Sequence, residues 1–248
     1  MSTYAQRLRY RLSRPGAPVA TYAIIALCVL AYAIQVVWPG FTDLMLFYPA
    51  YVAGEPSIST LTTTEYLPNW ALTGGFEFEP WRVLTYGFVH STSSFIPWHL
   101  LLNMYTLWVF GMVLEPAIGR ARYITVYLFG LAGGALGAFI LSPNSAVVGA
   151  SGALFALMGA VLVIQRRAGG QIGQLVVLLA INLVYGFSVG GVSWQAHLGG
   201  LIIGLLSGVI LAETRAPKDR GLQKVYFAIL GLVVVGLFYL TPAIMWYR

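Results

Sequence analysis

The chain has 248 residues, of which 58% are hydrophobic and only 9% are charged, and this composition excludes an ordinary soluble domain. Its apolar segments approach or exceed the roughly 20 residues that cross a hydrocarbon core of about 30 Å. The net charge of +6 does not indicate nucleic-acid binding, because the basic residues lie at the ends of these segments, as membrane topology signals do. The sequence therefore predicts an all-α membrane protein.

Residues 1–17 form a polar, basic segment that precedes the first apolar stretch, at about 19–38. This stretch is too long for the core of a secretory signal, and it ends without a small-residue cleavage site. We therefore expect a retained first transmembrane helix, followed by a long external loop over 39–95. The loop carries five acidic residues, Asp43, Glu55, Glu65, Glu77 and Glu79.

Six further apolar segments predict the remaining helices, at about 96–114, 122–141, 149–165, 172–189, 192–212 and 225–246. If seven helices alternate, 12 of the 14 Lys and Arg residues fall on one side of the membrane, leaving Arg82 and Arg248 on the other. The positive-inside rule then places the N-terminus in the cytoplasm and the acidic loop outside, in what we expect to be the cell membrane. We expect a six-helix core over 18–212, and a cytoplasmic linker with a seventh helix over 213–248.

The fourth helix is expected to begin with a serine between glycines, in Gly149-Ala150-Ser151-Gly152. Gly149 permits backbone geometry that a side chain would block, and the helix N-terminus leaves N–H groups free beside Ser151. These are the parts of a nucleophile next to an anion site. Taken alone, the spacing of Gly152, Ala156 and Ala160 is also typical of ordinary helix packing in membranes.

His197, on the sixth helix, is predicted to reach the depth of Ser151. About 22 Å of helix separates Ser151 from Gln165, so Ser151 should lie below the outer surface of the membrane. His197, expected as the sixth residue of its helix, reaches about 8 Å inward from the same side. It shares a helix face with three glycines, Gly200, Gly204 and Gly208. The small face of the fourth helix is the natural partner of this face.

His99 and Asn103 lie four residues apart and project from one face of the second helix. With Ser151 and His197 they permit acyl transfer, in which His197 takes the serine proton and Ser151 attacks a carbonyl. The Ser151 N–H, the Asn103 amide and His99 are the candidate donors to the developing oxyanion. No carboxylate is placed to complete a triad, so the sequence predicts a Ser–His dyad.

At this point the chain resembles the rhomboid family of intramembrane serine proteases, over about residues 18–212. The resemblance rests on Trp81-Arg82, His99-x-x-x-Asn103, Gly111-x-x-x-Glu115 followed by Gly119, Gly149-Ala150-Ser151-Gly152, and Ala196-His197-x-x-Gly200-x-x-x-Gly204. It implies a rhomboid-like six-helix core with a water-filled cavity opening outward, and an additional seventh helix. It also implies substrates that are membrane-anchored proteins, cut within or near a transmembrane segment.

The resemblance assigns a role to each site residue. Ser151 would be the nucleophile and His197 the base, with His99, Asn103 and the Ser151 amide as oxyanion donors. Phe155 would correspond to the aromatic residue that packs against the catalytic histidine in the family. Gly149 and Phe155 would both belong to the oxyanion and substrate-binding site.

Four further residues need a separate interpretation. In the family a histidine commonly lies shortly before His-x-x-x-Asn, but here His90 precedes His99 by nine residues, which indicates an insertion and leaves the role of His90 open. Glu115 is expected to be structural, pairing with Arg120 or Arg122 or capping backbone N–H groups. Trp81-Arg82 is expected to anchor the loop at the membrane interface.

Two other functions compete with proteolysis. A catalytically inactive relative would bind membrane clients without cutting them, but such relatives typically lack the serine or the histidine. A channel or transporter would be expected to show broken helices or charged pore residues, and neither is evident. The three histidines lack the His-Glu-x-x-His pattern of a zinc site. We expect no cofactor, no metal and no nucleic acid, and the expected partners are transmembrane protein substrates and the lipid bilayer.

Overall fold

The computed structural model describes residues 17–49, 79–188 and 191–245 of the chain. Within these ranges the chain is a bundle of long helices, and its only strand-like pairing is an isolated bridge between Phe47 and Val147. The basic N-terminal segment and much of the acidic loop, including Glu55, Glu65 and Glu77, lie outside the described residues.

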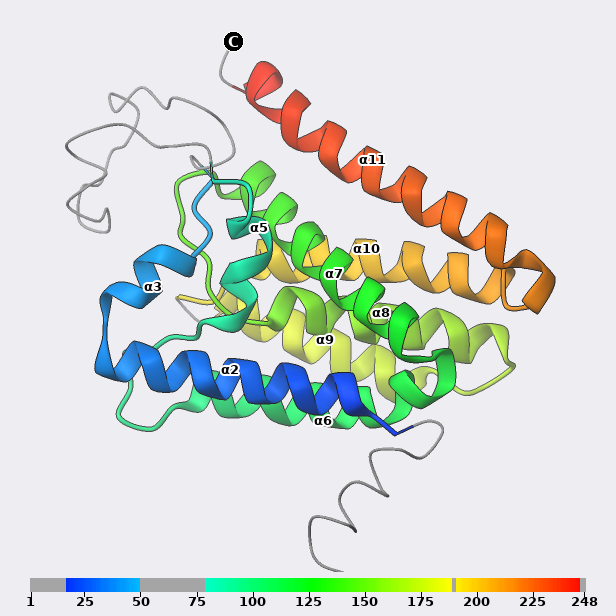
Figure 1. Cartoon of the computed structure of the whole chain (residues 1–248), viewed down its shortest axis with the longest axis horizontal. Coiled ribbons are helices and arrows are strands. Elements are labelled where there is room, and N and C mark those ends of the chain that lie inside the picture. The colour runs from blue at the N-terminus through cyan, green and yellow to red at the C-terminus, as the bar shows by residue number, and fades with distance from the viewer. Residues whose placement is uncertain (1–16, 50–78, 189–190, 246–248) are drawn as a thin grey trace, which may run out of the picture.

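Long helices form at each of the predicted apolar segments (Figure 1). In chain order they are α2 (Val19–Val37), α6 (Trp98–Ile118), α7 (Arg120–Leu141), α8 (Ser151–Arg167), α9 (Gly173–Ser188), α10 (Trp194–Glu213) and α11 (Arg220–Met245). The connection after α2 holds the short helices α3 (Gly40–Met45), α5 (Arg82–Thr85) and η4 (Tyr86–Phe88), and η5 (Pro217–Asp219) precedes α11.

Five helical segments of the described chain are long and apolar enough to cross a membrane. They are α2, α6, α7, α10 and the segment Pro217–Thr241, which contains most of α11. The other two long helices are shorter, with 17 residues in α8 and 16 in α9. The chain is therefore a multi-pass integral membrane protein, as predicted, while the count of seven crossings stays a prediction.

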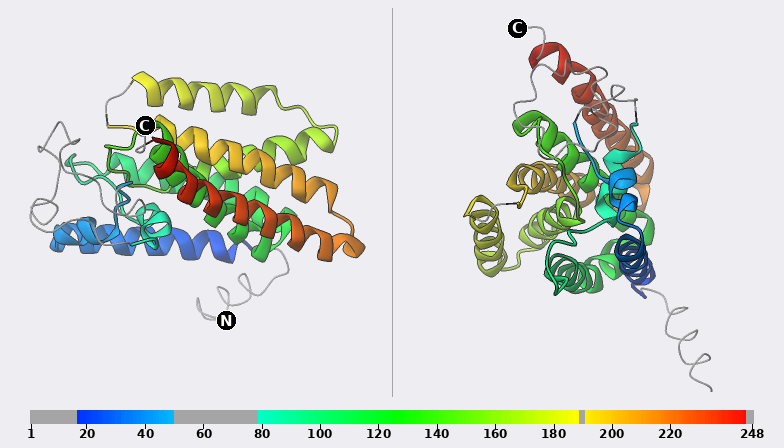
Figure 2. Two further views of the ribbon diagram at one scale, coloured as in Figure 1. Left: turned by 90° about the horizontal axis from the view of Figure 1, so that it is seen from above. Right: turned by 90° about the vertical axis from the view of Figure 1, so that its left-hand side faces the viewer.

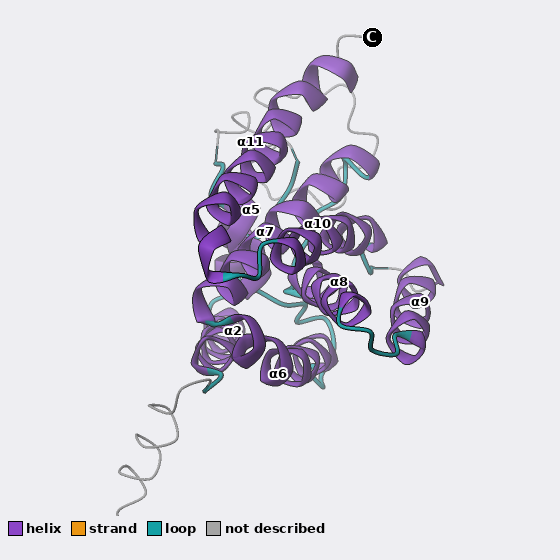
Figure 3. Ribbon diagram, turned by 90° about the vertical axis from the view of Figure 1, so that its right-hand side faces the viewer, coloured by secondary structure: helices purple, strands orange, loops and turns teal. Residues whose placement is uncertain are grey.

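Contact between α8 and α10 forms the centre of the bundle, with α7 packed against both (Figure 3). A β-carbon on Gly200 would collide with the carbonyl oxygen of Gly152, and one on Gly204 would collide with the backbone of Ala156. A β-carbon on Gly208 would lie 3.0 Å from the Ala160 α-carbon. The predicted pairing of the two small-residue faces is confirmed. It brings the backbones of α8 and α10 into direct contact, as small residues allow in membranes.

The remaining helices surround this centre. In Figure 1, α2 and α6 run side by side along the lower edge, and the two further views of Figure 2 place α9 at the edge of the bundle. Helix α11 runs alongside α7 and contacts it through two aromatic pairs. The ring centroids of Phe129 and Phe227 are 5.7 Å apart, and those of Phe139 and Phe238 are 5.6 Å apart.

Glu115 joins α6 to the first turn of α2. Its carboxylate accepts hydrogen bonds of 2.8 Å from the backbone N–H groups of Ala20 and Thr21, and another of 2.8 Å from the Thr21 hydroxyl. Arg120 lies 3.6 Å from the same carboxylate. A negative charge at a helix N-terminus satisfies free N–H groups and interacts favourably with the helix dipole. The predicted structural role of Glu115 is confirmed, although the N–H groups it caps belong to a distant helix.

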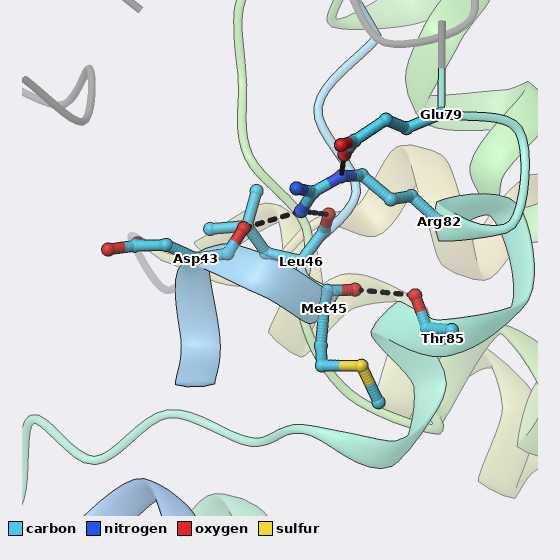
Figure 4. Close-up of polar contacts among 6 residues, drawn as sticks. All are labelled: Asp43, Met45, Leu46, Glu79, Arg82 and Thr85. Carbon is cyan, nitrogen blue, oxygen red and sulfur yellow. Dashed lines mark hydrogen bonds and ion pairs between the residues drawn. The ribbon is translucent and has the colours of Figure 1, made fainter. Parts of the chain in front are cut away.

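Arg82 ties α5 to α3 in the first connection (Figure 4). The buried guanidinium pairs with Glu79 and donates hydrogen bonds to the backbone carbonyls of Asp43 and Leu46. The Thr85 hydroxyl donates to the carbonyl of Met45 at 3.0 Å, which adds a second link between the same two helices. Arg82 therefore links α3 and α5 within this connection. The predicted anchoring of Trp81-Arg82 at the membrane interface stays a prediction.

Candidate active site

Ser151 is the first residue of α8, so its backbone N–H is among those that a helix leaves without a partner. The chain enters the helix through Gly149, whose φ of +110° is rarely adopted by residues with a side chain. The Gly149 N–H donates a 2.9 Å hydrogen bond to the carbonyl of Tyr86, which fixes this entry against η4. The predicted glycine-serine start of the fourth helix is confirmed.

His197 lies in the first turn of α10, at the same end of the bundle as Ser151. Because α10 begins at Trp194, His197 is its fourth residue and not the predicted sixth. The helix starts where Ser193 caps it, by accepting a 3.3 Å hydrogen bond from the Ala196 N–H. The His197 side chain is buried, with 7% relative exposure.

Phe155 connects Ser151 and His197 geometrically. Its ring stacks on the His197 imidazole with centroids 4.4 Å apart and an angle of 13° between the planes. Ser151 and Phe155 are four residues apart on α8, so they project from the same helix face. The serine hydroxyl and the imidazole therefore face one helix interface. No hydrogen bond joins these two described side chains, and catalytic hydrogen bonds are often long in ligand-free proteins.

His99 reaches the entry of α8 from the first turn of α6. Its Nδ1 accepts a 3.1 Å hydrogen bond from the Ser91 N–H, so a neutral His99 carries its proton on Nε2. A β-carbon built on Gly149 would lie 2.8 Å from that Nε2. The structure thus brings a ring N–H donor against Gly149, two residues before Ser151.

Asn103 lies one turn further along α6 and is buried. Its amide nitrogen donates a 2.7 Å hydrogen bond to the His99 carbonyl, which leaves the second amide hydrogen free to donate elsewhere. Four buried atoms in this region have no hydrogen-bond partner among the described residues: the Asn103 Oδ1, the His197 Nδ1 and both ring nitrogens of His90. Unpaired polar atoms are rare in protein interiors, and they are expected where a site binds water or a ligand.

His90 contributes through its backbone and its ring. The His90 N–H donates to the Gln35 Oε1 at 3.0 Å, and the Gln35 amide nitrogen donates back to the His90 carbonyl at 2.9 Å. The buried ring meets His99 edge-on, with centroids 5.2 Å apart. Burial, together with the neighbouring His99, lowers the pKa of His90 to about 3 against a smaller opposing effect of the Phe88 backbone, so the ring is neutral.

Gln35 is the site-positioning residue that the sequence did not reveal. Its side chain hydrogen-bonds to the backbone of His90. Ser91, the residue after His90, donates its N–H to the His99 ring, and that ring faces Gly149. The available signal was a lone amide side chain near the end of an apolar helix, since buried polar groups in membranes need partners.

The part of the chain that holds this site matches a known protein family. The family model for the rhomboid domain matches residues 77–214, which contain every predicted site residue but not Gln35. The chain belongs to the rhomboid family.

Relatives with assigned names include rhomboid protease GluP of Bacillus subtilis (strain 168), which is 30% identical over 206 residues, or 81% of this chain and 36% of GluP. RHOMBOID-like protein 6, mitochondrial, of Arabidopsis thaliana is 34% identical over 143 residues, or 54% of this chain and 44% of that protein. Putative rhomboid protease YdcA of Bacillus subtilis (strain 168) is 32% identical over 146 residues and is covered to 71%. The chain thus spans less than half of the first two of these rhomboid relatives.

Proposed function

We propose that this rhomboid protein is an intramembrane serine endopeptidase that uses a dyad of Ser151 and His197. The observation that carries the proposal is the stacking of Phe155 on His197, with centroids 4.4 Å apart, one turn after Ser151 on the same face of α8. A serine at a helix N-terminus and an imidazole at one interface are the nucleophile and base of acyl transfer. Relatives named as proteases support the reaction class.

The proposed reaction begins when His197 takes the proton of the Ser151 hydroxyl and the serine oxygen attacks the substrate carbonyl. The resulting oxyanion accepts hydrogen bonds from the Ser151 N–H, the Nε2–H of His99 and the Asn103 amide. His197 then returns its proton to the leaving amine, which leaves an acyl-enzyme. A water molecule, deprotonated by His197, releases the acid product and restores the serine.

The proposed substrates are membrane-anchored proteins cut within or near a transmembrane segment. Rhomboid proteins act on transmembrane substrates within the bilayer, and an intact helix hides its carbonyl groups in its own hydrogen bonds. Substrates with small residues, which unwind readily, should therefore be cut fastest. The specificity within this class depends on residues around Gly149 and Phe155.

We further propose that all seven long helices cross the membrane, with the first six as a core and α11 as an addition. In this topology Ser151 and His197 lie near the outer surface and the N-terminus lies in the cytoplasm, as the distribution of Lys and Arg indicates. The cell membrane is the proposed location, although one relative is named as mitochondrial.

The decisive experiment combines a fluorophosphonate probe with cleavage of a transmembrane substrate by the reconstituted full chain. The wild type should become labelled and should cut the substrate. Ser151→Ala and His197→Ala should each reduce cleavage by about 10³-fold or more, because dyad members act as a unit. Ser207→Ala, which removes a buried serine elsewhere on α10, is the matched control and should remain active.

Three outcomes would count against this mechanism. Cleavage by Ser151→Ala would show that the nucleophile is misassigned. A wild type that is neither labelled nor active on varied transmembrane substrates would favour the inactive, client-binding function. Loss of activity on adding a metal chelator would contradict a metal-free dyad, which should be unaffected.

A further inference from the structure

A pocket of about 200 Å³ lies at the end of the bundle opposite Ser151, where α7 begins and α6, α8 and α10 end. Figure 3 looks onto this end of the molecule. Three of the lining residues are arginines from or just after three different helices, Arg122, Arg167 and Arg215. The wall between them is apolar and includes Ile118, Ile164 and Leu211. The pocket therefore combines a cationic rim with a hydrocarbon surface.

The three arginines differ in how they are held. Arg122 donates through Nε to Gln223 of α11 at 2.6 Å, and this bond orients its guanidinium. Arg167 pairs with Glu213 at 2.5 Å, but both side chains are more than half exposed, so the pair is weak. Arg215 is exposed and has no ion-pair or hydrogen-bond partner among the described residues. Around the pocket, two positive charges remain uncompensated.

The position of the pocket along the helices matches the level of lipid headgroups. Helix α8 runs from Ser151 to Arg167, a rise of about 24 Å, and the apolar segments of α7 and α10 end near the same level. Basic pockets between transmembrane helices bind anionic headgroups, and the planar guanidinium group matches phosphate oxygens in pairs. The apolar wall below the arginines offers a surface for the acyl chains of the same molecule.

We propose that this three-arginine pocket binds the phosphate group of an anionic glycerophospholipid. Soluble phosphate has the same charge chemistry, but it would leave the partly exposed side chains of Ile118 and Ile164 uncovered, whereas a lipid covers both the cationic and the apolar part. The site is independent of the dyad, since it lies at the other end of α8 and shares no residue with it.

Native mass spectrometry of the purified full chain, titrated with phosphatidylglycerol or phosphatidylcholine of equal chain length, tests the proposal. The wild type should bind its first phosphatidylglycerol at least tenfold more tightly than phosphatidylcholine. The double variant Arg167→Gln/Arg215→Gln should lose this preference, with an affinity for phosphatidylglycerol about 30-fold lower, since each basic residue contributes roughly fivefold near an anionic lipid.

The matched control is Arg166→Gln/Lys218→Gln, which removes the same charge from the same end of the bundle but from outside the pocket. It should keep the preference, and thermal unfolding of both variants should show that each is folded. Equal loss in the two variants would overturn the proposal, because it would indicate a diffuse charge effect. Displacement of the lipid by inorganic phosphate alone would overturn the lipid assignment in favour of a soluble anion.

Discussion

Gly149 is the residue at which backbone conformation and site geometry depend on each other most directly. Its φ is +110°, and a β-carbon there would lie 2.7 Å from Cε1 and 2.8 Å from Nε2 of His99. Gly149→Ala should therefore displace His99 or strain the entry to α8, and cleavage should fall by about tenfold or more, as for loss of an oxyanion donor. Fluorophosphonate labelling rates and substrate cleavage measure this effect.

Gly169→Ala separates strain from site geometry, because Gly169 also has a positive φ, +79°, but no neighbouring atom within 4 Å of a β-carbon. It should lower the free energy of unfolding by about 1 kcal/mol and leave the labelling rate unchanged. Equal loss of labelling in both variants would contradict the role assigned to Gly149.

The buried His90 ring should make the stability of the protein decrease in acid. Its buried ring has a pKa of about 3, whereas an unfolded histidine titrates near 6.5. Between these values the unfolded chain binds more protons, so the contribution of His90 to stability is present above about pH 6.5 and is lost as the pH falls towards 3. His90→Gln should show a smaller drop in unfolding temperature than wild type between about pH 7 and pH 5. Equal drops in the two proteins would contradict this prediction.

At the residue scale, the motifs located Ser151, His197, His99 and Asn103 because each is a polar group in an apolar helix. Gln35 was missed, since its partners, the backbone groups of His90, lie 55 residues away along the chain. A backbone partner leaves no mark in sequence. The contact between His90 and His99 was missed for the related reason that the nine-residue spacing hides it.

At the scale of elements, the contact between α8 and α10 has no room for larger side chains at its glycines. Gly204→Ala should place a β-carbon against the backbone of Ala156, which no rotamer change relieves, and the free energy of unfolding should fall by about 3 kcal/mol or more. Thermal unfolding in detergent measures the change. Gly236→Ala in α11, where a β-carbon meets nothing within 4 Å, is the control and should leave stability unchanged or slightly higher. Similar losses in both variants would contradict the contact.

Helix boundaries were predictable where the signal is local. The start of α8 follows from the glycine and serine at its head, but α6 continues to Ile118 and not to the predicted 114. The apolar criterion stops before Glu115, whose charge is in fact matched by the N–H groups of Ala20 and Thr21. Similarly, α11 begins at Arg220 within the polar linker, before the apolar segment that predicted it at 225.

For the whole molecule, α11 is expected to support stability more than catalysis. The rhomboid domain match ends at 214, and α11 contacts α7 through Phe227 and Phe238, far along the chain from the site. Deletion of 217–248 should lower the unfolding temperature and preserve fluorophosphonate labelling of Ser151. The double variant Phe227→Ala/Phe238→Ala should reproduce this loss of stability in the full chain. Abolished labelling in a protein that remains folded would contradict the assignment.

The arrangement of helices in space was predictable only for the pair α8 and α10. Small residues at a regular spacing identify an interface, but lipid-facing and protein-facing side chains are otherwise equally apolar. The edge position of α9 and the position of α11 alongside α7 therefore leave no periodic signal in the sequence. The residues of the candidate site could be identified from the sequence, but the positions of the helices around them could not.

The connection from His90 to His99 is fixed separately at its two ends, by Gln35 and by the Ser91 N–H. Between them Phe95 is fully exposed, at 105% relative exposure, so this stretch can change in length or composition without releasing His99. Cys28, the single cysteine of the chain, is entirely buried. Phe95→Cys therefore creates one reactive thiol, where a fluorophore or spin label could report the arrival of a substrate beside the site.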